Sequence, residues 1–113
     1  MNKVLLIGRL AKDCELRYVG EDKTAVLNFT LAVQKPFLNK DGEKDADFIP
    51  IVYWKKASEA LAPYLKKGKV ISVMGRINIR AYTKENGEKK YSAQVVAEQI
   101  QFVDLFKHKE KAE

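Results

Sequence analysis

The chain of 113 residues is 46% hydrophobic, which fits one folded domain and excludes a disordered protein. Its net charge of +6 and isoelectric point near 9.4 favour an acidic partner such as nucleic acid, although charges of both signs occur. Cys14 is the single cysteine, so no disulfide forms within the chain and a reducing, cytoplasmic location is expected. No apolar run approaches the ~20 residues of a membrane span, so no membrane partner is expected.

Five strand regions are expected from alternating or short apolar runs. In chain order they cover residues 3–10, 25–33, 47–55, 70–82 and 91–103. Pro50 has no amide hydrogen, so the third strand is expected to lie at a sheet edge or to be bulged there. The fourth and fifth strands are joined by a segment with Asn86-Gly87, a strong signal for a hairpin because both residue types tolerate positive φ.

A helix is expected over residues 57–67, whose apolar side chains have helical spacing, and Pro63 inside it should kink or shorten it. Residues 34–46 are rich in turn formers and mixed charge and are expected to form a long exposed loop. Residues 1–106 then form the folded domain, and residues 107–113 form a short charged flexible tail.

This order of elements predicts an all-β fold. Five strands with one helix between the third and fourth is the layout of the OB-fold, a small Greek-key barrel. An SH3-like barrel has the same number of strands. The position of the helix and the two long hairpin loops favour the OB-fold.

The fourth strand has two contrasting faces. Arg76, Arg80 and Tyr82 have the same parity, so they are expected to face solvent together. The opposite parity is apolar and is expected to fill the core. It comprises Ile71, Val73, Ile77, Ile79 and Ala81.

The third strand is apolar on both faces. Phe48 and Trp54 share one face, while Ile49, Ile51 and Tyr53 supply the other. One of these faces must lie outside the barrel, so some large apolar groups are expected to be exposed. The alternative is that Trp54 caps the barrel and Phe48 packs under the long loop.

Exposed aromatic rings among cations suit the unstacked bases and phosphates of a single nucleic-acid strand. Base stacking is expected on Phe37, Phe48, Trp54 and Tyr82. Phosphate contacts are expected from nine basic residues: Lys3, Arg9, Lys35, Lys55, Lys56, Lys67, Arg76, Arg80 and Lys84. The predicted activity is therefore binding of a single strand.

Catalytic chemistry has no candidate residues. His108 is the only histidine and lies in the expected tail, so neither a histidine triad nor a histidine metal site is expected. The acidic residues between positions 41 and 47 lack the spacing of a calcium loop and read as a solvated charged segment. No glycine pattern for nucleotide phosphates occurs. The chain is therefore expected to be no enzyme and to hold no cofactor or metal.

Three blocks carry a resemblance to a known family. They are residues 2–10 (NKVLLIGRL) followed by Asp13, Glu15 and Arg17-Tyr18; residues 64–68 (YLKKG); and residues 73–76 (VMGR). In this order they are similar to the bacterial single-stranded DNA-binding protein (SSB) family, over about residues 2–103. By this resemblance the base-stacking positions of the family fall on the four aromatics named above.

The resemblance also implies partners and roles. Family members commonly form homotetramers, the first strand helping to pair subunits, and coat single-stranded DNA in replication, recombination, repair or DNA uptake. A cytoplasmic, nucleoid-associated location follows. Replicative members continue into an acidic tip ending in phenylalanine that recruits partner enzymes. These residues lack such a tip, so a short member or a truncated chain is expected, without recruitment through a tip.

A protein ligand is the main alternative to DNA. An OB-fold subunit of a replication complex, like the SSB-related primosomal subunit, binds chiefly another protein. In that case replacing Trp54 and Tyr82 should alter a protein contact and spare function. An OB-fold nuclease would need clustered carboxylates, and the sequence offers none.

Overall fold

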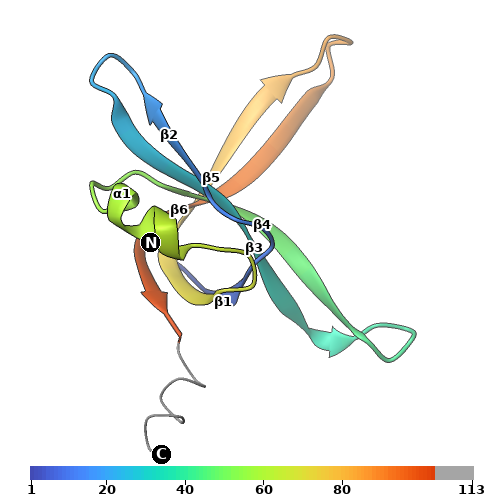
Figure 1. Ribbon diagram of the computed structural model, residues 1–113. Helices are drawn as coiled ribbons and strands as arrows, with labels where there is room; N and C mark the ends of the chain where they lie inside the picture. Colours follow the sequence, from blue (N-terminus) through green and yellow to red (C-terminus); the bar gives the residue numbers. More distant parts are fainter. Residues whose placement is uncertain (104–113) are drawn as a thin grey trace, which may run out of the picture.

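The computed structural model describes residues 1–103, and Figure 1 shows a barrel from which three hairpins project. Along the chain lie β1 (Val4–Leu10), β2 (Glu15–Val19), β3 (Thr24–Leu38), β4 (Lys44–Tyr53), α1 (Ser58–Leu61), the 3-10 helix η1 (Ala62–Tyr64), β5 (Val70–Thr83) and β6 (Lys89–Phe102). The expected tail, residues 107–113, lies outside the described residues. Neither helix of the described part has the length and apolar character needed to cross a membrane.

Pairing between the first and third strands closes the sheet into a barrel. The strand order is β1-β5-β6-β4-β3-β2, and β1 also pairs with β3 at Arg9–Ala32 and Leu10–Leu31. All pairs are antiparallel except β4 with β6, which run parallel over two residues of each strand. A closed barrel with its helix between β4 and β5 is the arrangement expected for the OB-fold.

The core consists of the inward-facing residues of the strands. Leu27, Leu31, Ile51, Ile71 and Val73 are each at most 2% exposed. Alternation along each strand places these side chains on the inner face, where each contributes roughly 1.5–3 kcal/mol by leaving water. Leu65, which follows η1, is also fully buried in this core. The short helical segment therefore acts as a plug on the barrel.

Two of the projecting hairpins carry aromatic residues that were expected to stack on bases. The β3–β4 arm is the hairpin of residues 34–46, and the β5–β6 arm is the hairpin of residues 76–96 (Figure 1). The segment of residues 34–46 is largely exposed, as expected, but the expectation of a loop is wrong, because β3 and β4 extend into it and leave only a turn. Asn39 stabilises this turn, since its side-chain oxygen accepts hydrogen bonds from the amides of Asp41 and Glu43.

The apolar side of β5 was expected to fill the core throughout, and this is wrong beyond the barrel. Val73 is buried, but Ile77 is 42% exposed and Ile79 is 62% exposed. The alternation of side chains continues, but β5 and β6 leave the barrel near Gly75, and within residues 1–103 no second layer of protein lies against the apolar face of the arm. The arm therefore exposes both a basic face and an apolar face.

Residues 1–103 form six strands where five were expected. The additional strand, β2, has five residues and pairs with β3 from Glu15–Asn28 to Val19–Thr24. The expected helix is shorter than residues 57–67, because α1 covers one turn and Pro63 lies in η1, as a proline inside the segment predicts.

The predicted hairpin and sheet edge are present. Gly87 has φ 86°, while Asn86 does not share the positive φ. A three-residue hairpin loop with glycine in the left-handed position has this form. Pro50 pairs with Thr30 of β3, whereas pairing with β6 begins only at Ile51, so Pro50 lies on a free edge of β4.

Candidate nucleic-acid interface

One face of the β5–β6 arm carries a tyrosine and two arginines. Arg76, Arg80 and Tyr82 occupy alternate positions of β5 and are all exposed, so they share one side of the two-stranded arm. Tyr82 is 50% exposed and lies directly opposite Lys90 of β6, which adds a further cation. The predicted grouping of these three residues on one solvated face is confirmed.

The arginines of this face take part in none of the ion pairs found among the described residues. Lys90 forms an ion pair with Glu88 at 3.0 Å near the tip of the arm. Within residues 1–103, no ion pair includes Arg76 or Arg80. Their guanidinium groups can therefore meet a phosphate without first breaking an internal contact.

Phe48 on the outer face of β4 is exposed to solvent, and so is Trp54, which directly follows this strand. Phe48 is 65% exposed and Trp54 is 48% exposed, whereas Ile51 and Tyr53 on the opposite face are buried in the core. The alternative in which Trp54 caps the barrel and Phe48 packs under the long loop does not hold. Phe48 precedes Pro50 on the free edge of β4, which leaves room for a ligand beside its ring.

An apolar pocket of about 360 Å³ lies next to Phe48. Its lining includes Phe48 and Pro50 from β4, Ile77 from β5, and Ala93 from β6. The pocket therefore joins the outer face of β4 to the root of the β5–β6 arm. A planar ring can enter it with apolar surface on more than one side.

Phe37 lies on the β3–β4 arm and is the most exposed of the four predicted aromatics, at 78%. Between Gln34 and Leu38 the register with β4 shifts, because four steps on β3 oppose two on β4. Pro36 lies inside this bulge and cannot donate to the ladder. The irregular backbone presents Phe37 to solvent.

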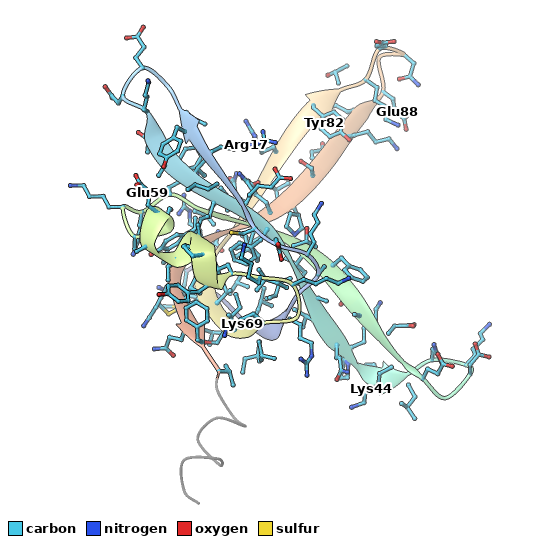
Figure 2. The ribbon with its side chains drawn as sticks, viewed as in Figure 1. Arg17, Lys44, Glu59, Lys69, Tyr82 and Glu88 are labelled. Atoms are coloured by element: carbon cyan, nitrogen blue, oxygen red, sulfur yellow. The ribbon has the colours of Figure 1, made fainter. Side chains whose placement is uncertain are left out.

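The structure does not gather the four aromatics into one pocket. Tyr82 is on the β5–β6 arm, while Lys44 marks the other arm, which carries Phe37 and points away from it (Figure 2). Phe48 lies on β4, which runs into the barrel from the β3–β4 arm, and Trp54 directly follows the last residue of this strand. The result is an extended series of exposed rings, which suits a long flexible chain better than a small molecule.

The nine predicted basic residues are all exposed, but four of them already have internal partners. Lys3 pairs with Glu98 at 3.7 Å, and Lys35 pairs with Asp47 at 3.3 Å. Two more donate to main-chain carbonyl oxygens: Arg9 to Gly68 at 3.3 Å and Lys55 to Glu98 at 2.6 Å. Within the described residues, the other five form no ion pair: Lys56, Lys67, Arg76, Arg80 and Lys84.

Sequence reasoning missed an exposed aromatic pair near the end of β6. Tyr64 and Phe102 meet edge to face with ring centroids 6.5 Å apart, and the Lys69 ammonium lies 5.7 Å from the Phe102 centroid. Tyr64 is 63% exposed and is the last residue of η1.

The described residues offer no catalytic or metal chemistry. Within residues 1–103, no three histidine, cysteine, aspartate or glutamate side chains are grouped to hold a metal ion. Burial raises the pKa of the Cys14 thiol, which donates a hydrogen bond to the Ala62 carbonyl oxygen at 3.4 Å. A thiol with a raised pKa is a poor nucleophile at neutral pH.

Comparison with known proteins matches residues 1–103 to the model of the Single-strand binding protein family. The chain belongs to this family. It is 50% identical to "Single-stranded DNA-binding protein 2" of Clostridium acetobutylicum over 92% of this chain and 77% of that protein. It is 47% identical to the single-stranded DNA-binding protein of Clostridium tetani, over 92% of this chain and 71% of that protein.

The single-stranded DNA-binding protein of Halalkalibacterium halodurans is 48% identical over 92% of this chain and 61% of that protein. These matches confirm the resemblance read from the sequence blocks, and with it the OB-fold. Members of the family are binding proteins, so the expectation that this chain is not an enzyme is also confirmed.

Proposed function

We propose that this protein binds single-stranded DNA by stacking bases on its exposed aromatics and meeting phosphates with the basic residues around them. Binding of single-stranded DNA follows from membership of the family and from the names of its relatives. The stacking mechanism rests on one observation above all: Phe48, Trp54 and Tyr82 are 65%, 48% and 50% exposed on surfaces that also carry cations.

Base stacking is assigned to Phe37, Phe48, Trp54 and Tyr82. Each ring offers a flat π-face to a base, worth roughly 1–3 kcal/mol per stacked base and tolerant of sequence. The pocket beside Phe48 adds apolar contacts from Pro50 and Ile77. Bases of a duplex are already stacked on one another, so duplex DNA should bind poorly.

Phosphate contacts divide into two classes. Five residues meet the backbone directly: Lys56, Lys67, Arg76, Arg80 and Lys84. The other four exchange an internal partner for a phosphate: Lys3, Arg9, Lys35 and Lys55. Because the Lys3–Glu98 and Lys35–Asp47 pairs are solvent-exposed, each is worth at most about 1 kcal/mol, and a phosphate can replace it.

A homotetramer is the proposed assembly. Leu5 and Ile7 on the outer face of β1 are 75% and 64% exposed, and with Met74 they line a depression of about 370 Å³. The β1 edge from Val4 to Gly8 has β5 on one side, and its pairing with β3 begins only at Arg9. An apolar face beside an open strand edge fits pairing with a second copy.

The proposed unit is the domain of residues 1–106, followed by the charged tail of residues 107–113. The proposed setting is the cytoplasm, on the nucleoid, in replication, recombination, repair or DNA uptake.

A protein as chief ligand is the second candidate, and the apolar face of the β5–β6 arm favours it. Ile79 and Tyr91 are 62% and 68% exposed there, on the side opposite Tyr82. If a protein were the main ligand, Ile79→Ser would abolish function, while Trp54→Ala and Tyr82→Ala would spare it. The DNA proposal requires the reverse order of effects.

The deciding experiment is a titration with oligo-dT followed by the fluorescence of Trp54, the only tryptophan. Saturable quenching that weakens at higher salt supports stacking on Trp54 combined with phosphate contacts. Absence of quenching together with absence of binding in a gel-shift assay overturns the proposal and favours the protein ligand.

A further inference from the structure

The side chain of Asn2 bridges the main chain of β5 at the root of the β5–β6 arm. Its Nδ2 group donates to the Ile77 carbonyl oxygen at 2.8 Å, and its Oδ1 accepts from the Ile77 amide at 2.9 Å. An amide side chain presents one donor and one acceptor, as a backbone neighbour would. Asn2 therefore supplies an additional rung beyond the last pair of the β1–β5 ladder, Val4–Gly75.

Ile77 is placed where the arm leaves the barrel and where the arm ladder is irregular. Met74 pairs with Gln99 and Gly75 pairs with Ala97, so Glu98 is an extra residue of β6 without a partner on β5. Such a bulge bends the strands and weakens pairing locally. The bulge that bends the arm therefore lies opposite Gly75, two residues before Ile77, where the hydrogen bonds from Asn2 are made.

Two further side chains from outside the arm reach the same bulge. The Lys55 ammonium donates to the Glu98 carbonyl oxygen at 2.6 Å, and the Lys3 ammonium pairs with the Glu98 carboxylate at 3.7 Å. These contacts hold the β6 side of the root, while Asn2 holds the β5 side. Beyond Ile77 the arm is exposed on both faces, so packing against the barrel does not fix its direction.

We propose that Asn2 is a positioning residue that sets the direction of the β5–β6 arm and thereby places Tyr82, Arg76 and Arg80 for single-stranded DNA. The functional half of this inference rests on the proposed stacking role of Tyr82. A fixed arm holds its ring and guanidinium groups in place before the strand arrives, which lowers the ordering cost of binding. Loss of the two hydrogen bonds lets the arm swing about the bulge.

Arm direction is measured directly by electron-spin distance measurements in the full chain. Labels are placed at Glu21→Cys in the β2–β3 turn and Glu85→Cys at the tip of the β5–β6 arm, in a Cys14→Ser background. Labelled chains are diluted with unlabelled protein so that only pairs within one chain contribute. Asn2→Ala should broaden or shift the distance distribution, and an unchanged distribution overturns the proposal.

Function is tested by combining substitutions and measuring the Kd for oligo-dT. Asn2→Ala should weaken binding by roughly threefold to tenfold in the wild-type background. In the Tyr82→Ala background the same change should have a much smaller effect, because the displaced ring is already absent. In the Phe37→Ala background, on the other arm, it should keep its full effect.

Asn2→Asp separates the role of the hydrogen bonds from general loss of folding. It keeps the acceptor for the Ile77 amide but replaces the donor to the Ile77 carbonyl oxygen by a second acceptor, so arm broadening should persist. Because Asn2 is exposed, the carboxylate keeps its water and the melting temperature should stay close to wild type. If Asn2→Ala weakens the Kd for oligo-dT equally with and without Tyr82, the proposal that Asn2 acts by placing Tyr82 is overturned. If Tyr82→Ala alone leaves Kd unchanged, the stacking proposal fails, and the spin distances still decide whether Asn2 positions the arm.

Discussion

Gly75 of β5 lies directly against the main chain of Val96 in β6, so a Cβ added to Gly75 would overlap the Val96 carbonyl oxygen. The contact occurs beside the Glu98 bulge, where the arm leaves the barrel. Any side chain at position 75 would push the two strands apart at this point. The close approach of the strands therefore depends on glycine at position 75.

Replacing Gly75 with alanine should lower the free energy of unfolding by roughly 2–4 kcal/mol, because main-chain atoms cannot move aside as a flexible side chain can. Gly87→Ala is the matched control, since a Cβ there meets open space and pays only for its φ of 86°. That control should lose about 1 kcal/mol. Urea unfolding of both variants tests the difference, and equal losses would contradict overlap as the cause.

Trp54→Ala and Tyr82→Ala should each weaken binding to oligo-dT by roughly 1–3 kcal/mol, because each removes one stacking surface. Both side chains are about half exposed, at 48% and 50%, so the barrel should remain folded. Tyr18→Ala is the control, since Tyr18 is 52% exposed on β2 and has no assigned role. Kd by fluorescence anisotropy and the circular dichroism spectrum are measured together. Unfolding of Trp54→Ala or Tyr82→Ala would identify those aromatics as core residues.

Arg80→Ala should make the salt dependence of oligo-dT binding shallower by about 0.7 in the log–log slope, the value for one phosphate of a single strand. Arg17→Ala should leave the slope unchanged, because Arg17 lies on β2 and is paired with Glu15 at 3.0 Å. Titrations at four or more salt concentrations give both slopes. An Arg80 variant with the wild-type slope would remove this residue from the phosphate contacts.

The Cys14 thiol should react slowly with iodoacetamide in the folded protein. Burial raises the pKa of this thiol above the ordinary 9.0, and the thiol donates a hydrogen bond to the Ala62 carbonyl oxygen. The same shift stabilises the folded state below the ordinary pKa, a contribution that is lost as the pH rises through the raised value. Cys14→Ser should therefore flatten the decline of melting temperature above about pH 9. Alkylation as fast as that of the unfolded chain would contradict this burial.

Alternation along a strand predicted faces correctly but not how far the barrel extends. The parity of Arg76, Arg80 and Tyr82 depends only on the local chain, so the sequence was sufficient to group them. Burial of Ile77 and Ile79 depends on whether a second layer lies against β5 there. The presence of such a layer is a property of the whole barrel. The alternation of apolar and polar residues in the arm is the same as in a core strand, so the sequence does not distinguish the two.

The contacts that modify the site join residues far apart in the chain. Lys55 and Glu98, or Asn2 and Ile77, show no pattern in sequence, because nothing local indicates which carbonyl a lysine or asparagine will reach. The exposure of Phe48 and Trp54, by contrast, followed from the sequence, because residues 47–55 are apolar on both strand faces and only one of these faces can lie in the core. The sequence thus predicted the exposure of Phe48 and Trp54, but it did not predict the exposed pair of Tyr64 and Phe102 or how the arms carry the rings.

Ile7→Glu should disrupt the proposed assembly while leaving the barrel intact. Ile7 is 64% exposed on the outer face of β1, so a carboxylate is solvated in the single chain but would be buried without a partner between two copies. Sedimentation velocity should show a lower mass than for the wild type, with an unchanged far-ultraviolet spectrum. Glu21→Ala, in the β2–β3 turn, is a control that changes charge away from this face. A wild-type protein that sediments as a single chain, or an Ile7 variant of unchanged mass, would exclude β1 as the pairing surface.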